Sequence, residues 1–302
     1  MSSIQDQFPD FTNHHQVYDA VDSQTTLQGS TAGKVIFLTG ASQGIGRAKA
    51  IAFAQAGAKA IYLVARSEHG LKETRDLVAK ANSGTECAIA TCDVTQTADV
   101  TSAVDDCVAQ FGAIDIADAN AGYLGPWVKF GESDPEGWWY NWEVNLRGAY
   151  HVARFTIPHL ITSARRRAET EASGGHLILM SSIGAQLLMP GASDYQTSKH
   201  AINRLCEFIQ TDHGADGIKC FAMHPGGVAT ELGHNMPEAL HEHLIDEPEL
   251  AAGFAVWLTS GKADWATGRY LSATWDVDEL VARKDAILNG DQLVNRLRIA
   301  HD

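Results

Sequence analysis

The sequence is poor in the residues that build disulfide-bonded or metal-binding proteins. It contains five cysteines among 302 residues, and none forms a CxxC pair or stands at metal-ligand spacing from another. An odd number of cysteines, set mainly among apolar residues, indicates reduced thiols in a reducing compartment. His241 and His243 lie two residues apart and would diverge on a helix, so we expect no metal site.

The chain also lacks long apolar runs and an excess of positive charge. No run reaches the roughly 18 apolar residues of a membrane-spanning helix, and the N-terminus has neither the basic start nor the apolar stretch of a signal peptide. With 23 Lys and Arg against 37 Asp and Glu, the net charge is −14, which argues against nucleic acid and anionic lipid as partners. We therefore expect a cytoplasmic protein with no nucleic-acid or membrane partner.

Basic residues cluster in one place, Arg165-Arg166-Arg167, and Glu169 and Glu171 follow them. Alternating blocks of charge of this kind are typical of a helix surface. We interpret the cluster as a solvated helix end, with an anion-binding site as the alternative.

Prolines are few, eight in all, and no proline-rich or Gly/Ser linker divides the chain. This favours one domain, over residues 33–275, with an N-terminal arm over 1–32 and a C-terminal extension over 276–302. Short apolar runs there alternate with amphipathic segments. The expected strands are 35–39, 60–64, 87–92, 114–119, 177–181, 219–223 and 270–272. The expected helices are 44–56, 70–81, 97–111, 135–165, 194–213 and 247–260.

Continuous apolar strands that alternate with helices indicate a parallel sheet buried on both faces. Right-handed crossovers then give a doubly wound α/β fold. Asp118 is an exception within the fourth strand, because a buried carboxylate needs a partner or a raised pKa. The sequence suggests no partner for it, and a position toward the rim of the sheet is the alternative.

A glycine-rich loop follows the first strand and opens the first helix. Glycines allow a tight turn and a close backbone approach to a pyrophosphate, and the helix N-terminus supplies N–H groups and a positive dipole. The residues expected to contact a dinucleotide here are Gly40, Ser42, Gln43, Gly44, Ile45 and Gly46. Their GxxxGxG spacing resembles that of the short-chain dehydrogenase/reductase family over residues 34–275. The resemblance implies a Rossmann fold with a seven-stranded parallel sheet in the order 3-2-1-4-5-6-7 and helices on both faces.

Arg66 at the end of the second strand bears on the choice of cofactor. An NAD-selective protein usually places a carboxylate there, whereas Arg66 can pair with a 2′-phosphate and Ser42 can add a hydrogen bond. Glu68 lies nearby and complicates the interpretation. NADP(H) is favoured; the alternative is that Arg66 stacks on adenine in either cofactor.

Three further segments resemble cofactor-binding motifs of the family, each at the carboxyl end of a strand. Asp93-Val94 resembles the pair beside adenine, and Asn120-Ala121-Gly122 resembles the turn that faces the cofactor. Pro225-Gly226-Gly227-Val228-Ala229-Thr230 resembles the segment around the nicotinamide, in which Pro225, Gly226, Val228 and Thr230 are the expected contacts. A simple strand-exit turn is the alternative for this last segment.

Tyr195 and Lys199 carry the strongest catalytic signal. Residues four apart lie on one face of a helix, so the phenol and the ammonium would face one site. A cation beside the phenol lowers its pKa from near 10 toward the working range. Both residues are expected to contact the cofactor as well.

The family resemblance adds two catalytic residues. Ser182, thirteen residues before Tyr195, matches the serine that binds the substrate carbonyl oxygen, with Ser181 as the rival because only one of two successive strand residues faces the site. Asn145 resembles the helix asparagine that holds a water near the lysine. The implied reaction is hydride transfer between nicotinamide and a carbonyl carbon, with Tyr195 as the proton donor or acceptor.

The substrate side is expected in a lid over residues 229–250. The expected lining residues are Tyr123, Leu124, Gln186, Leu187, Leu188 and Met236. They are mainly apolar, which favours a medium-sized hydrophobic ketone or alcohol; packing residues of the core are the alternative.

Trp138, Trp139, Tyr140 and Trp142 form an aromatic cluster that belongs either to the core or to an oligomer interface. The family resemblance implies a homodimer or homotetramer, and the two tails resemble those of fungal members. Two other functions compete with an alcohol dehydrogenase or ketoreductase. One is a cofactor-binding sensor or scaffold without turnover. The other is a cofactor-assisted isomerase or epimerase, whose relatives usually carry a larger C-terminal domain.

Overall fold

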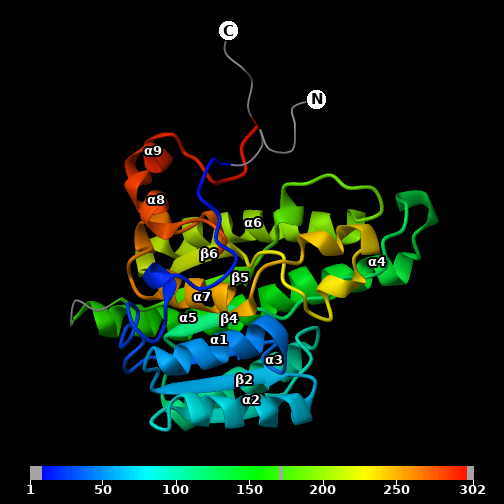
Figure 1. Ribbon diagram of the computed structural model, residues 1–302. Coiled ribbons are helices and arrows are strands. Elements are labelled where there is room, and N and C mark those ends of the chain that lie inside the picture. The colour runs from blue at the N-terminus through cyan, green and yellow to red at the C-terminus, as the bar shows by residue number, and fades with distance from the viewer. Residues whose placement is uncertain (1–8, 170–172, 298–302) are drawn as a thin grey trace.

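The strands form one parallel sheet in the order β3-β2-β1-β4-β5-β6-β7, as Figure 1 shows. The computed structural model describes residues 9–169 and 173–297. The strands are β1 Val35–Thr39, β2 Ala60–Ala65, β3 Glu86–Thr91, β4 Ile116–Ala119, β5 His176–Met180, β6 Lys219–His224 and β7 Tyr270–Ser272. The expected doubly wound fold and strand order are confirmed. The limits of β1 and β7 are as expected, and those of the other strands differ by one or two residues.

Helices cover both faces of the sheet. They are α1 Gly44–Gln55, α2 Glu68–Ala81, α3 Thr97–Phe111, α4 Pro135–Trp142, α5 Gly148–Ala168, α6 Ser193–His213, α7 Pro248–Thr259, α8 Val277–Ala282 and α9 Lys284–Asn289. Side chains alternate along β1: Ile36 and Leu38 join the core under α1 and α7, and Val35 and Phe37 join the core under α3 and α5. The uninterrupted apolar strands of the sequence thus reflect burial on both faces.

The single helix expected over 135–165 is interrupted. α4 ends at Trp142, a π-helical turn spans Glu143–Arg147, and α5 begins at Gly148. The wider turn carries Asn145, whose side chain is hydrogen-bonded to the loop after β4. The apolar periodicity of the sequence does not reveal the extra residue of the π-helical turn, because the amphipathic pattern continues on both sides of that turn.

Asp118 does not point toward the rim of the sheet. Its Oδ2 lies 2.8 Å from Nζ of Lys49 on α1, and both side chains are fully buried. Burial raises the pKa of Asp118, while the ammonium of Lys49 opposes the rise. The partner that the sequence did not reveal is therefore a lysine 69 positions earlier in the chain.

The arginines at the end of α5 are not simply solvated. Arg166 and Arg167 donate to Oδ1 of the buried Asp115 at 2.8 and 2.7 Å. Burial alone would raise the pKa of Asp115, but hydrogen bonds from Arg167 and Ser163 lower it. These charge-assisted bonds tie α5 to the amino end of the sheet.

The N-terminal arm packs on the domain (Figure 1). The ring of Phe11 lies 5.0 Å from that of Trp275, and Val21 is fully buried. A Cβ at Gly253 of α7 would come within 2.3 Å of the Val21 carbonyl oxygen, so glycine at that position lets the arm approach the helix.

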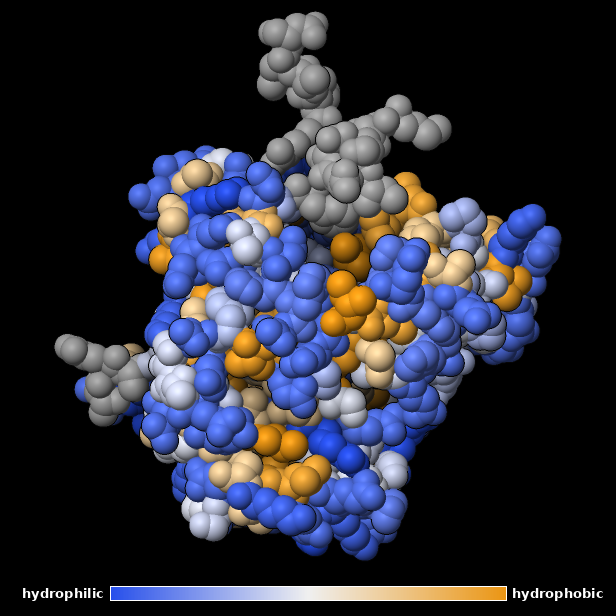
Figure 2. All heavy atoms as spheres, in the orientation of Figure 1, coloured by the Kyte–Doolittle hydropathy of each residue, from blue (hydrophilic) through white to orange (hydrophobic). Residues whose placement is uncertain are grey.

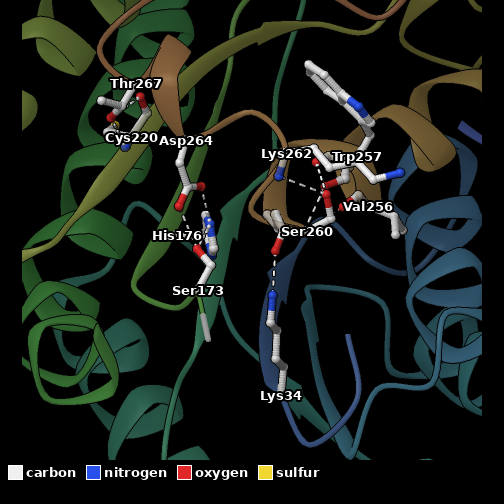
Figure 3. Close-up of polar contacts among 12 residues, drawn as sticks. Lys34, Ser173, His176, Cys220, Val256, Trp257, Ser260, Lys262, Asp264 and Thr267 are labelled. Carbon is white, nitrogen blue, oxygen red and sulfur yellow. Dashed lines mark hydrogen bonds and ion pairs between the residues drawn. The ribbon is translucent and has the colours of Figure 1, made fainter. Parts of the chain in front are cut away.

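A polar cluster joins β5 to the loop before β7 at the amino edge of the sheet, as Figure 3 shows. The Ser173 hydroxyl and Oδ1 of Asp264 both bind Nε2 of His176, at 3.1 and 2.9 Å. A Ser-His-Asp relay needs the serine and the carboxylate on different ring nitrogens. The cluster is therefore structural.

Within the described residues, every helix is too short or too polar to span a bilayer.

Candidate active site

A cleft of about 400 Å³ opens at the carboxyl ends of the strands, where ligands bind in open α/β sheets. Most residues predicted to contact a dinucleotide border it: Gly40, Ser42, Gln43, Gly44, Ile45, Gly46, Arg66, Asp93, Val94, Asn120, Ala121, Gly122, Tyr195, Lys199, Pro225 and Thr230. Gly226 and the buried Val228, which were also predicted, do not line the cleft.

The glycine loop has no room for side chains. A Cβ at Gly46 would lie 2.1 Å from the Gly40 carbonyl oxygen, and one at Gly40 would lie 2.9 Å from Cα of Ala121. Gln43 precedes α1 in extended conformation, and its side chain donates to Glu231 instead of capping the helix. The N-terminus of α1 thus faces the cleft with its positive dipole end, and the loop fits a pyrophosphate.

Asn120 and Thr39 join the ends of β1 and β4. Nδ2 of Asn120 donates to the Thr39 carbonyl at 3.0 Å, and the Ala121 amide donates to the Thr39 hydroxyl at 3.2 Å. These bonds hold the floor of the cleft at the point where the strand order reverses.

Arg66 and Ser67 follow β2 on the cleft wall. Glu68 is turned to its own helix, where its carboxylate pairs with Lys72 at 2.6 Å. Nη1 of Arg66 donates to the Tyr140 hydroxyl of α4 at 3.2 Å. Tyr140 borders the cleft and was not predicted to do so. Its contact with Arg66 is a tertiary one between positions 74 residues apart, which no local pattern of the sequence reveals.

Tyr195 and Lys199 lie together on α6. Nζ of Lys199 is 5.6 Å from the Tyr195 ring centroid and donates to the Met180 carbonyl at 2.8 Å. Burial lowers the pKa of Lys199 to about 7. Burial raises the pKa of Tyr195, and the Ser182 hydroxyl beside it opposes the rise. The lowering of the Tyr195 pKa by Lys199 that we expected is not seen.

Ser182, and not Ser181, has its hydroxyl beside Tyr195. A Cβ at Gly184 would lie 3.3 Å from Oγ of Ser182 and 3.4 Å from Cε1 of Tyr195. Ser181 lines the cleft and Ser182 does not, but the Ser181 hydroxyl donates to Asn203 of α6 at 2.6 Å.

Asn145 is buried and holds the loop after β4. Its Oδ1 accepts from the Tyr123 amide at 2.8 Å, and its Nδ2 donates to the Tyr123 carbonyl at 2.9 Å. A Cβ at Gly122 would lie 3.4 Å from Oδ1 of Asn145 and 3.7 Å from Nζ of Lys199. The side-chain amide of Asn145 and the ammonium of Lys199 therefore both lie next to Gly122.

Not all of the predicted substrate residues line the cleft. Tyr123 borders the cleft, and its ring packs edge-on against Tyr140 at 5.0 Å. Gln186 and Met236 are half-buried outside the cleft lining, and Leu188 is fully exposed. A pattern of apolar residues does not distinguish a substrate wall from a surface loop.

Segment 229–250, predicted to be a lid, contributes residues that the sequence did not single out. Glu231 and Leu232 border the cleft, and Glu231 accepts a hydrogen bond of 2.7 Å from Gln43. Nδ2 of Asn235 donates to the Leu124 carbonyl at 3.1 Å. Figure 2 shows hydrophobic side chains gathered around the lid.

The aromatic cluster of α4 is partly packed and partly exposed. Trp138 stacks on Trp142 and donates to Ser193, whereas the side chain of Trp139 is 58% exposed.

No group of three or more His, Cys, Asp or Glu side chains within residues 9–169 and 173–297 is arranged to hold a metal ion.

The sequence of the chain matches a model of the family described as short chain dehydrogenase over residues 34–241. The chain is 43% identical to the short chain dehydrogenase mpl6 of Monascus purpureus, over 94% of both chains. It is 38% identical to the short chain dehydrogenase pigC of Monascus ruber, over 93% of this chain and 91% of that one. The protein belongs to the short-chain dehydrogenase/reductase family, an oxidoreductase family.

Solved structures agree with this assignment. The carveol dehydrogenase of Mycobacterium avium, in complex with NAD, has a TM-score of 0.72 and 25% identity, over 81% of this chain and 97% of that one. The 3-ketoacyl-(acyl-carrier-protein) reductase of Brucella melitensis, complexed with NADH, has a TM-score of 0.71 and 26% identity, over 80% and 96%. A nicotinamide dinucleotide is therefore the class of cofactor that the family supports.

Proposed function

We propose that the protein interconverts a ketone or aldehyde and an alcohol, using NADP(H), with Tyr195 as the general acid and base. The observation that carries the proposal is the meeting of Tyr195 with Ser182 and Lys199, where Tyr195 and Lys199 line the cleft. The nicotinamide ring, when bound, supplies or accepts the hydride. Gly40, Gly46 and the N-terminus of α1 would hold the pyrophosphate.

In the reductive direction the Tyr195 phenol donates its proton to the carbonyl oxygen as the carbonyl carbon gains hydride. The raised pKa of Tyr195 keeps the phenol protonated at neutral pH, as a proton donor requires. The Ser182 hydroxyl stabilises the developing oxyanion. The Lys199 ammonium would return a proton to Tyr195 from solvent, and Asn145, which lies beside the same Gly122 as Lys199, would hold a water of that proton path.

The preference for NADP(H) rests on Arg66. β2 is followed by Arg66 and Ser67 on the cleft wall, and the neighbouring carboxylate of Glu68 is engaged by Lys72. A guanidinium at this position favours a 2′-phosphate, which a carboxylate would repel. The two relatives of known structure described above were solved with NAD or NADH, so the preference is a point on which this chain would differ.

An apolar substrate of medium size fits the surroundings of the cleft. Tyr123, Tyr140 and Leu232 border it, and hydrophobic side chains gather around the lid (Figure 2). We further propose a cytoplasmic homodimer or homotetramer in which the exposed face of α4 contributes to an interface, since aromatic residues such as Trp139 are enriched at such surfaces.

Titration of the purified protein with NADPH and NADH, followed by fluorescence, tests the cofactor assignment. We expect NADPH to bind at least about tenfold more tightly, and Arg66→Ala to remove most of that preference. Arg75→Ala is the matched control, because Arg75 lies on the exposed face of α2 beside Asp76. Equal or tighter NADH binding would contradict the NADP(H) assignment. Binding of either cofactor without turnover on any carbonyl compound would favour a sensor or scaffold instead.

A further inference from the structure

A histidine of the N-terminal arm reaches a buried carboxylate near the end of segment 229–250, the predicted lid. Nδ1 of His15 lies 2.6 Å from Oδ1 of Asp246, and the Asp246 side chain is only 6% exposed. The arm is also bound through its backbone, because the Glu247 amide donates to the His15 carbonyl at 2.8 Å. The arm therefore meets the last residues of the lid through a side chain and a main-chain bond.

Asp246 in turn holds the turn that follows β6. Its Oδ2 accepts from the Gly227 amide at 2.6 Å, and its own amide donates to the Gly227 carbonyl at 2.9 Å. A Cβ at Gly226, where φ is +95°, would lie 2.5 Å from Oδ2 of Asp246. The carboxylate is thus packed against the backbone of Pro225–Val228, the segment predicted to lie beside the nicotinamide.

Both partners of the contact lie outside the segment that the family model matches. Both His15 and Asp246 lie outside residues 34–241, which match the family, whereas Gly227 lies within them. The neighbouring histidine makes a similar contact elsewhere: Nε2 of His14 lies 2.8 Å from Oδ2 of Asp276, the residue that caps α8. Two successive histidines thus fasten the arm, His15 to Asp246 and His14 to Asp276 of the C-terminal extension.

We propose that His15 is a positioning residue, which acts through Asp246 to hold the Pro225–Val228 turn in the conformation that receives the nicotinamide end of the cofactor. This inference rests on the proposed function. A charge-assisted hydrogen bond orients the Asp246 carboxylate, and the carboxylate fixes the Gly227 amide. Residues 9–32 of the N-terminal arm, none of which lines the cleft, thereby act on the site through Asp246.

Three variants test the proposal. His15→Ala removes the contact, His15→Asn keeps a donor close to the position of Nδ1, and His14→Ala is the matched control because it loosens the same arm without touching Asp246. Two measurements are made on each: amide hydrogen exchange of peptides covering residues 225–247, and cofactor affinity, together with KM and kcat where turnover is found. Thermal unfolding shows whether each variant is folded.

We expect His15→Ala to speed exchange across 225–247 and to weaken cofactor binding by at least about fivefold, with KM affected more than kcat. His15→Asn should restore most of the slow exchange and most of the cofactor affinity. His14→Ala should change neither the exchange rate across 225–247 nor the cofactor affinity. Unchanged exchange, an equal effect of His14→Ala, or faster exchange with unaltered cofactor affinity would overturn the proposal. Failure of the proposed function is distinguishable, since the wild-type protein would then bind neither NADPH nor NADH; in that case the positioning role falls with it.

Discussion

At the scale of single residues, the chemistry of the site depends on which hydroxyl faces Tyr195. Alcohol oxidation needs the Tyr195 phenolate, so its rate rises with pH through the pKa of that phenol. Because the Ser182 hydroxyl lowers this pKa, Ser182→Ala should move the rise in kcat to higher pH and reduce kcat by roughly 10²-fold.

Ser181→Ala is the control for this pH profile, because the Ser181 hydroxyl is bound to Asn203. It should leave the position of the rise unchanged. A shift caused by Ser181→Ala and not by Ser182→Ala would reverse the assignment of the two serines.

The buried pair of Lys49 and Asp118 makes a second prediction at this scale. Asp118→Ala leaves a buried ammonium without its counter-charge and should cost about 3–5 kcal/mol of unfolding free energy. The double variant Lys49→Met, Asp118→Leu removes both charges and should recover most of that loss. Denaturant unfolding measures both.

Lys72→Met provides a comparison, because Lys72 pairs with Glu68 in solvent and its loss should have no measurable effect on unfolding. A small effect of Asp118→Ala would show that the Lys49 ammonium loses its proton at little cost.

The sequence predicted some of these residues and not others, for a physical reason. Tyr195 and Lys199 are linked by helical spacing, which can be read locally. Lys49 and Asp118 are joined only by the packing of α1 on β4. Tyr140 was missed for the same reason, since its contact with Arg66 spans 74 positions of the chain.

At the scale of elements, the turn from β1 to α1 has no space for a methyl group. Gly46→Ala would place a Cβ 2.1 Å from the Gly40 carbonyl oxygen, so the turn must open. We expect at least about a tenfold loss of cofactor affinity in a fluorescence titration. Gly131→Ala is the control, because a Cβ there meets no atom within 4 Å. Cofactor affinity unchanged in Gly46→Ala would contradict the pyrophosphate site.

The seven strands and the helices up to α7 followed from periodicity, but α8, α9 and the π-helical turn at Glu143–Arg147 did not. It is selected by the hydrogen bonds of Asn145 to Tyr123, a tertiary contact. Sequence patterns report which face of a helix is buried and do not report how a turn widens to meet a loop.

At the scale of the whole molecule, buried histidines tie stability to pH. Burial lowers the pKa of His224 to about 3, while an unfolded histidine titrates near 6.5. The unfolded chain therefore binds the extra proton first, and this contribution to stability is lost as pH falls below about 6.5.

His224→Gln should reduce the loss of unfolding free energy between pH 7 and pH 5 by about 2 kcal/mol, as measured by denaturant unfolding at the two pH values. His69→Gln, at an exposed site on α2, is the control. An equal loss in wild type and His224→Gln would show that His224 does not stay neutral in the folded protein.

The order of the seven strands was predicted from the resemblance carried by the glycine loop and the Tyr–Lys pair, and the structure confirms it. The path of the arm was not predictable, because residues 9–32 have no sustained periodicity and pack through single contacts such as Phe11 on Trp275.

The central claim is that Tyr195 transfers the proton that accompanies hydride transfer. The most direct test is consumption of NADPH, followed at 340 nm, over a panel of apolar ketones and aldehydes with wild-type protein and Tyr195→Phe. We predict oxidation of NADPH by the wild type on at least one carbonyl compound, and a loss of at least about 10²-fold in Tyr195→Phe with NADPH affinity retained. Turnover that survives Tyr195→Phe undiminished would contradict the account.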